Sequence, residues 1–365
     1  MKSNDSNFQR NLWQRLSGNA GALFGLIIIS ISLLIALFAY LIAPDHSPHA
    51  NRMILEIGGR KPGFRQEFLL IKKNRTTDNG SWLSHVFKGK EDAYTYVPIN
   101  RYAYFGDSLI VWKFIDEGVE ERASYFQLQK ERSMDERYKV EVRTFLLGTD
   151  RYGRDILSRL LIGVRVSLAV GLVTVVISLT LGVILGAIAG YFGGRIDDLV
   201  MWFINVIWSI PTLLLVFAIT LVLGKGFWQV FVAIGLTMWV NVARIIRGQI
   251  LSVRELEYVE AGRALGYSSL RIIFLHILPN VMGPVLVVAA SNFASAIVIE
   301  SGLSFLGIGV QPPQPSWGLM IKENYNFIIT HNPMLALVPG IAIMLLVLAF
   351  NLLGNGLRDA LDVRA

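Results

Sequence analysis

The stretch 166-VSLAVGLVTVVISLTLGVILGAIAG-190 runs for 25 residues without a charged side chain. A helix rises about 1.5 Å per residue, so about 20 apolar residues cross the hydrocarbon core of a bilayer, which is roughly 30 Å thick. The stretch therefore predicts a transmembrane helix. Gly182, Gly186 and Gly190 recur in it at every fourth position, and small residues at this spacing let a second helix approach closely. That second helix could belong to this chain or to a partner subunit.

Five further apolar runs bring the number of predicted transmembrane helices to six. They lie at residues 21–43, 199–223, 228–245, 281–299 and 334–355. The first run is longer than the roughly 7 to 15 residues of a signal-peptide core, so we expect it to remain as the first span. Because 53% of the residues are hydrophobic and only 17% are charged, the predicted fold class is an all-α polytopic membrane protein.

Basic residues in short connections predict the orientation of the spans. The segment 1–20 carries three basic residues against one aspartate, and the connection 244–275 carries five arginines against three glutamates. We therefore expect both segments and the C-terminus on the cytoplasmic side of a bacterial cytoplasmic membrane, with 1–20 as an amphipathic leader on its surface. Four arginines at 151–165 oppose this orientation, but long loops translocate largely regardless of charge. Basic loops around apolar spans explain the net charge of +7, and we expect no nucleic-acid partner.

Residues 44–146, between the first two spans, differ from the rest of the chain. Of the 61 charged side chains in the chain, 32 lie in this segment, so we expect it to face water. Four stretches rich in β-branched and aromatic residues predict strands. They are 67-EFLLI-71, 94-YTYVPI-99, 109-LIVWKF-114 and 137-RYKVEV-142. The prediction is a small β-rich extracytoplasmic insertion domain, and the alternative is a loosely ordered loop.

Motifs for catalysis are absent from the sequence. The chain has no cysteine, no phosphate-binding loop and no metalloprotease or nucleophile-elbow motif, and its five histidines lack metal-ligand spacing. We therefore predict no catalytic residue, no metal site and no cofactor bound by this chain. His46 and His49 beside Asp45 are the nearest candidates for an enzyme site. A membrane receptor or scaffold that couples an outer module to a cytoplasmic partner is a competing class.

Sparse polar residues inside the predicted spans mark a candidate translocation path. Pro211, in 208-WSIPTLL-214, removes a backbone donor and bends the helix, and such bends often border a cavity. Hydrogen bonding between helices is the alternative role for the polar residues. The candidate path residues are Asn205, Ser209, Pro211, Asn241, Ser291, Asn292, Ser295 and Glu300.

A polar segment, 255-ELEYVEAGRALGYSSLRIIFLHILPN-280, interrupts the apolar runs. Tyr258, Ala261 and Leu265 form one apolar stripe, which predicts a short amphipathic helix. Gly266 can end this helix in the left-handed conformation, a serine can cap the next helix, and we expect Pro279 to stop that second helix before the following span. A helix pair held at both ends in this way can pass a partner's displacement to the spans.

This segment and three others resemble a known family. Glu260-Ala261-Gly262, followed at fixed spacing by Gly266 and by 276-HILP-279, is similar to the EAA loop of ABC importer permeases, with Gly262 in place of the usual second alanine. The other three segments resemble signatures of the C-type permease subunit of dipeptide, oligopeptide and nickel importers. They are 147-LGTDRYGRDILSRLLIGVRVSL-168, 190-GYFGG-194 and 302-GLSFLGIGVQPPQPSWG-318.

The resemblance implies a type I ABC importer permease fold, with residues 147–365 as the transmembrane domain and 250–279 as its coupling loop. The implied partners are a second homologous permease subunit, one or two cytoplasmic ABC ATPase subunits that bind ATP and Mg²⁺, and an extracytoplasmic solute-binding protein. The implied cargo is a dipeptide or oligopeptide, with nickel or another small solute as the alternative. Residues 44–146 exceed the usual short connection, so the resemblance leaves their role open. The implied contacts to the ATPase are Glu257, Glu260, Ala261, Gly262, Arg263 and Gly266.

Overall fold

The structure is a computed structural model that describes residues 13–73, 81–105, 108–126, 138–224, 226–329 and 332–361. Most of the predicted leader, together with Arg137 and His331, lies outside the described residues. The chain divides into two compact units. We call Met1–Leu33, Ser167–Gln311 and Ala342–Ala365 the helical unit, and Leu34–Val166 with Pro312–Ile341 the sheet unit.

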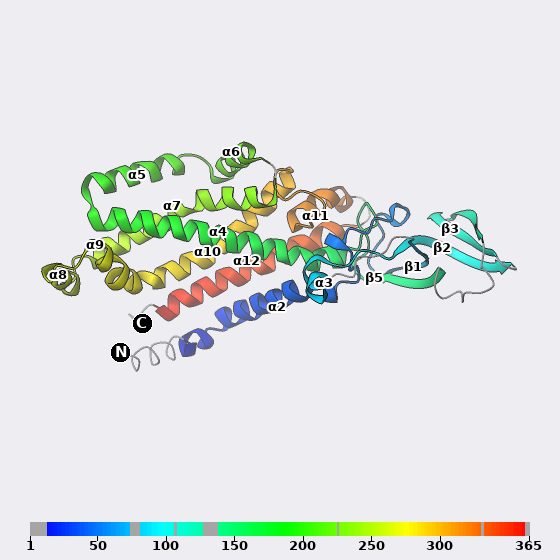
Figure 1. Cartoon of the computed structure of the whole chain (residues 1–365), viewed down its shortest axis with the longest axis horizontal. Helices are drawn as coiled ribbons and strands as arrows, with labels where there is room; N and C mark the ends of the chain where they lie inside the picture. The colour runs from blue at the N-terminus through cyan, green and yellow to red at the C-terminus, as the bar shows by residue number, and fades with distance from the viewer. Residues whose placement is uncertain are drawn as a thin grey trace. The chain divides into compact units, whose positions relative to one another are not determined.

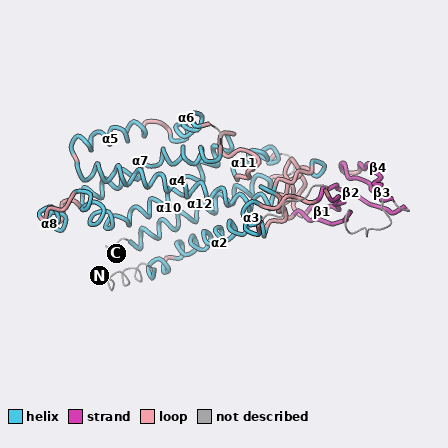
Figure 2. The backbone as a smooth tube through the Cα atoms, in the orientation of Figure 1, coloured by secondary structure: helices cyan, strands magenta, loops and turns pink. Residues whose placement is uncertain are grey.

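Helices long and apolar enough to cross a membrane dominate the chain (Figures 1 and 2). Within the described ranges there are five. They are α2 (Ala20–Ile42), α4 (Ile156–Phe192), α7 (Phe227–Val253), the helix Ser269–Leu306 that contains α10 (Leu278–Leu306), and α12 (Met334–Leu361). A bent pair, α5 (Gly194–Trp208) and α6 (Thr212–Leu223), gives a sixth span when counted as one. The predicted membrane fold class is confirmed, and the predicted six spans equal this upper count.

Pro211 breaks the third span instead of only bending it. α5 ends at Trp208, α6 begins at Thr212, and the two helices meet at 93°. Proline has no N–H donor and its ring clashes with the preceding turn, which destabilises a regular helix, and at Pro211 the helix ends. The Ser209 amide donates to the Asn205 carbonyl oxygen at 3.0 Å, and the Ser209 hydroxyl donates to the Val206 carbonyl oxygen at 2.7 Å. The predicted single helix over 199–223 was therefore wrong in its continuity.

The glycine stripe of α4 packs against α7 of the same chain. A methyl group added at Gly186 would lie 2.5 Å from the carbonyl oxygen of Ala243, and one added at Gly190 would lie 2.9 Å from that of Arg247. At Gly182 the added group would lie 2.8 Å from the Trp239 carbonyl oxygen. Backbone atoms cannot yield as flexible side chains do, so all three positions need the absence of a side chain. Of the two interpretations of the stripe, the structure shows packing within the chain.

This contact predicts a sharp difference between two glycines in helices. Gly186→Ala should destabilise the fold of the helical unit by about 1–3 kcal/mol, because the added methyl group forces α4 and α7 apart. Gly248→Ala in α7 is the matched control, since nothing lies within 4 Å of its added methyl group. We expect the control to be neutral or to stabilise by up to about 1 kcal/mol. Thermal unfolding of the purified protein in detergent measures both, and equal shifts would contradict the packing described.

The sheet unit is built on a five-stranded antiparallel sheet with strand order β4-β3-β2-β1-β5. The strands are β1 (Phe64–Lys72), β2 (Tyr94–Phe105), β3 (Ser108–Asp116), β4 (Val119–Phe126) and β5 (Tyr138–Phe145). The four predicted strands are confirmed at β1, β2, β3 and β5. β4 was missed because half of its sequence, VEERASYF, is charged or a small polar residue, and the short helix α3 (Trp82–Lys88) was missed as well.

Both faces of the sheet are covered. On one face, Phe68 packs with Ile54, Ile57 and Phe145. On the other face, a second cluster is centred on Leu69, whose side chain is fully buried. The rings of Tyr125 in β4 and Tyr138 in β5 lie 6.2 Å apart although these strands form opposite edges. The sheet therefore curls around the second cluster, and the insertion is an ordered fold.

A neck of paired backbone closes the base of the insertion. The two sides of the neck are residues 54–60 and 148–154. The Ile54 amide donates to the Tyr152 carbonyl oxygen at 3.1 Å, and the Gly59 amide donates to the Asp150 carbonyl oxygen at 2.8 Å. These bonds hold the start and the end of the insertion together.

Buried charges fix the neck to the start of α4. The Arg154 side chain is 1% exposed and pairs at 2.6 Å with both Asp150 and Glu323, the latter in α11 (Trp317–Asn324). Its Nη1 also donates to Asn51 Oδ1 at 3.2 Å. Nearby, burial raises the pKa of Asp155, against hydrogen bonds from Ser158 that act to lower it. A buried ion pair is strongly destabilised when one partner is removed, so this cluster locks the geometry of the neck.

Candidate functional site

The polar segment forms a short helix, a tight turn and a second helix. The first helix is α8 (Glu257–Ala264). Gly266 follows it with φ of 75°, the left-handed conformation that the sequence predicts. The Ser268 hydroxyl accepts a hydrogen bond from the Arg271 amide at 3.4 Å and caps α9 (Ser269–Arg271).

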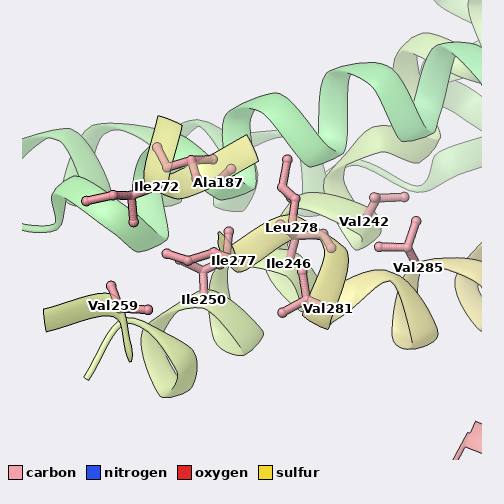
Figure 3. Packing of buried hydrophobic residues seen from close by; sticks show 11 residues of the cluster. Ala187, Val242, Ile246, Ile250, Val259, Ile272, Ile277, Leu278, Val281 and Val285 are labelled. Carbon is pink, nitrogen blue, oxygen red and sulfur yellow. The ribbon is translucent and has the colours of Figure 1, made fainter. Parts of the chain in front are cut away.

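The face that α8 turns toward the spans differs from the predicted stripe. Val259 is fully buried and belongs to one cluster with Ile250 of α7 and with Ile272 and Ile277 (Figure 3). The predicted stripe residues are exposed instead, Leu265 to 71%. The predicted short amphipathic helix is confirmed as α8, and its apolar stripe faces away from the core of the chain. Periodicity identified an apolar face, and this face is the one left uncovered in the single chain.

Pro279 does not stop the second helix, which is a further correction. α9, the π-helical stretch Ile272–Ile277 and α10 run on as one helix over Ser269–Leu306. The Leu278 amide donates to the carbonyl oxygen of Ile273, five residues earlier. A widened turn of this kind relieves the clash between the proline ring and the preceding turn. The loop is therefore continuous with the fifth span.

The predicted coupling residues separate into an exposed group and one buried member. Gly262 is buried. A methyl group added there would meet Tyr267 at 3.6 Å and Ile272 at 3.8 Å, which are ordinary contact distances. Glycine at this position therefore leaves room for the more usual alanine. The exposed members are Glu257, Glu260, Ala261, Arg263 and Gly266.

Two glycine substitutions in this loop should act in opposite directions. Gly262→Ala should stabilise α8 by up to about 1 kcal/mol, because glycine is a poor helix former and the methyl group fits. Gly266→Ala should destabilise the turn by about 1–2 kcal/mol, because the left-handed conformation is strained for alanine. Amide hydrogen exchange across residues 257–271 measures both, with slower exchange expected for the first variant and faster exchange for the second. Faster exchange in both variants would contradict the fit at Gly262.

Several candidate path residues meet at the break between α5 and α6. A cavity of about 190 Å³ lies there, bordered by Trp208, Thr212, Asn241 of α7 and Ser295 of α10. The Trp208 Nε1–H donates to Asn241 Oδ1 at 3.2 Å. Pro211 and Ser209 form the break itself, and Asn205 lies one turn before it on α5. Of these candidates, Asn241 and Ser295 border the cavity, while Asn205, Ser209 and Pro211 lie at or just before the break.

Three other candidate path residues, all on α10, lie neither at the break nor among the residues that border the cavity. Asn292 is buried and donates to Ser178 Oγ of α4 at 3.3 Å, so it bonds two helices, as the alternative interpretation states. Glu300 is buried and accepts a hydrogen bond from the Ser304 hydroxyl at 2.6 Å. Ser291 is exposed, one helical turn before Ser295.

Two residues were missed from the sequence: Trp208, which borders the cavity, and Arg244, which contacts Trp208. The Arg244 guanidinium carbon lies 3.6 Å from the centre of the Trp208 ring, and Arg244 Nη2 lies 3.4 Å from Asn205 Oδ1. In the sequence, Arg244 indicates only the orientation of the spans, as one of the basic residues of the connection 244–275. Its position three residues after Asn241, on the same helix face, is the signal that was available.

A second hollow, of about 470 Å³, lies in the sheet unit beside Arg52 and Asp92. Arg52 Nη2 lies 2.5 Å from Asp92 Oδ1 and 3.2 Å from Asp45 Oδ1, and the guanidinium stacks on Tyr96. Burial alone would lower the pKa of Arg52, but the hydrogen bond to Asp92 and the charge of Asp45 together raise it. This arginine is therefore held in internal pairs. In the described parts of the chain, no group of three or more His, Asp or Glu side chains could hold a metal ion.

Two family models match the chain, one over its C-terminal half and one near its N-terminus. Residues 182–365, which contain α8 and the cavity, match the family described as binding-protein-dependent transport system inner membrane component. The chain belongs to this family. Residues 7–55 of the permease also match the N-terminal transmembrane domain of oligopeptide transport permease C. The permease is therefore a transport subunit and not an enzyme.

Curated relatives of the permease are transport system permease proteins. It is 36% identical to a dipeptide transport system permease protein of Bacillus subtilis over 80% of its own length and 90% of the relative's. It is 41% identical to an oligopeptide transport system permease protein of the same organism, over 59% and 70% of the two chains. It is also 41% identical to a glutathione transport system permease protein of Pectobacterium atrosepticum, over 59% and 71%.

Proposed function

We propose that the permease forms half of the translocation path of an ATP-driven importer of peptides. The cargoes in the names of its relatives, oligopeptides, dipeptides and glutathione, support this cargo class. The proposal includes a second homologous permease, one or two cytoplasmic ATPase subunits that bind ATP and Mg²⁺, and an extracytoplasmic solute-binding protein. Both termini are then cytoplasmic, and residues 44–146 lie outside the membrane.

The observation that carries the proposal is the route from α8 to the cavity. Val259 of α8 packs in one cluster with Ile250 near the end of α7 (Figure 3). α7 is one helix over Phe227–Val253, and Asn241, which borders the cavity, lies nine residues before Ile250. A displacement of α8 by a bound ATPase therefore moves a rigid element that lines the path. The exposed apolar side chains Leu265 and Tyr258 supply the surface for that partner.

The contact with the ATPase can be tested at Glu260, which is exposed in the first turn of α8. Glu260→Lys reverses the charge at a helix N-terminus and on the proposed partner surface, where a like charge costs several kcal/mol. We expect peptide uptake to fall at least about tenfold while membrane insertion is unchanged. The measurement is uptake by cells, together with recovery of the ATPase subunits on an affinity-tagged permease.

Glu121→Lys in β4 is the control, since Glu121 is also exposed but lies outside α8. It should leave recovery of the ATPase unchanged. The wild-type permease should copurify with a second permease and with ATPase subunits. Recovery of a clean monomer or homodimer would contradict the proposed assembly, and normal uptake by Glu260→Lys would contradict the role of α8.

A further inference from the structure

The guanidinium group of Arg244 lies closer to the middle of α7 than its Cα position suggests, because its side chain extends toward the N-terminal end of that helix. Its neighbour Arg247, three residues on, pairs with Asp197 near the start of α5, with Arg247 Nη2 lying 2.6 Å from Asp197 Oδ2. Arg244 instead contacts Asn205 and Trp208, which lie 8 and 11 residues beyond Asp197, or about 12 and 16 Å along α5. α5 runs beside α7 (Figure 1). Helical side chains point toward the N-terminus of their own helix, so Arg244 extends away from the coupling-loop end.

The Arg244 guanidinium is held in place but only weakly bonded. It stacks on Trp208, whose ring is fixed by the hydrogen bond to Asn241. Within the described residues its only hydrogen bond is the 3.4 Å contact to Asn205. Its Nε is buried and has no hydrogen-bond partner, and no described carboxylate lies within 4.0 Å of the side chain. A guanidinium has five N–H donors, so most of its binding capacity is unused.

We propose that Arg244 is a carboxylate-binding group of the translocation path and that it binds the free C-terminal carboxylate of the peptide cargo. The inference rests on the proposed function and adds a recognition residue to it. A planar guanidinium forms paired hydrogen bonds with a carboxylate, and a charge-assisted pair is stronger away from bulk water. The Trp208 face presets the plane of the guanidinium and partly offsets its charge while no cargo is bound.

The adjoining cavity suits such a ligand. Trp208 and Asn241, which hold Arg244 in place, also border the 190 Å³ cavity. A peptide in the cavity would therefore have its backbone beside amide and hydroxyl groups, including Ser295, and its carboxylate toward Arg244.

The test measures equilibrium binding to the purified permease and ATPase complex in nanodiscs without the solute-binding protein. The probes are one radiolabelled tripeptide with a free C-terminal carboxylate and the same tripeptide as its C-terminal amide. Wild type should prefer the acid. Arg244→Gln should weaken binding of the acid by about tenfold to a hundredfold, as expected for loss of a charged hydrogen-bonded pair, and should leave the amide unchanged. Arg244→Lys should retain part of the preference.

Arg247→Gln is the matched control, because Arg247 lies one turn away and pairs with Asp197. Any effect of this variant should be equal for acid and amide. A second measurement uses the absence of cysteine from the chain. In a complex whose partner subunits lack reactive cysteines, Arg244→Cys should regain the preference for the acid after modification with a trimethylammonium thiol reagent. A sulfonate reagent should not restore it.

Three results would overturn the assignment. Equal losses for acid and amide would make Arg244 a structural contact between α5 and α7. Loss of the second permease from the Arg244→Gln complex would make it an interface residue. If the wild-type complex bound the tripeptide acid no more tightly than the amide at millimolar concentrations, the path would contain no carboxylate-binding site. If the wild-type complex imports no peptide in cells, the proposed function fails, whereas normal import with unchanged preference in Arg244→Gln refutes only the role of Arg244.

Discussion

A backbone in hydrocarbon must satisfy its own hydrogen bonds, and the helical unit follows from this constraint. Long uninterrupted helices meet it directly, which is why α4 and α7 can pack closely at glycines. Pro211 has no N–H group to donate to the preceding turn, and the helix of the third span breaks there. At the break, the Ser209 hydroxyl donates to the Val206 carbonyl oxygen, and a cavity borders the break. The break in the third span and the cavity that borders it therefore have the same cause.

α7 joins the functional parts of this unit. Its C-terminal third carries Ile250, which packs with α8, and its middle carries Asn241 at the cavity. Its other side receives the glycines of α4. A helix of 27 residues moves largely as a rigid body. A displacement of α7 at its contact with α8 therefore also displaces its contacts at the cavity and with α4. In the proposed importer, coupling between α8 and the cavity would need no relay of side chains beyond α7 itself.

The sequence predicted the spans well because hydrophobic runs report directly on burial in lipid. It failed where neighbours decide the outcome. β4 is too polar to identify alone and exists because β3 pairs with it. The stripe of Tyr258, Ala261 and Leu265 is a real apolar face, but sequence periodicity cannot say which partner covers it. Asn241 and Ser295 could be identified from the sequence as polar residues inside spans. Arg244 could not, because it falls in the predicted connection 244–275, and the sequence does not show that its long side chain extends along α7 to contact Trp208 and Asn205.

The neck of the insertion has a consequence for how such a chain can diverge. Its two sides are bonded to one another and locked by Arg154, Asp150 and Glu323, so the ends that lead into and out of the curled sheet are adjacent. A segment with adjacent ends behaves as a cassette. The residues between the two sides of the neck can become longer or shorter, or be replaced by another fold, without changing the register of α4. The contacts that fix the start of α4 are made by the neck and by the Arg154 cluster, and these are not part of the replaced segment.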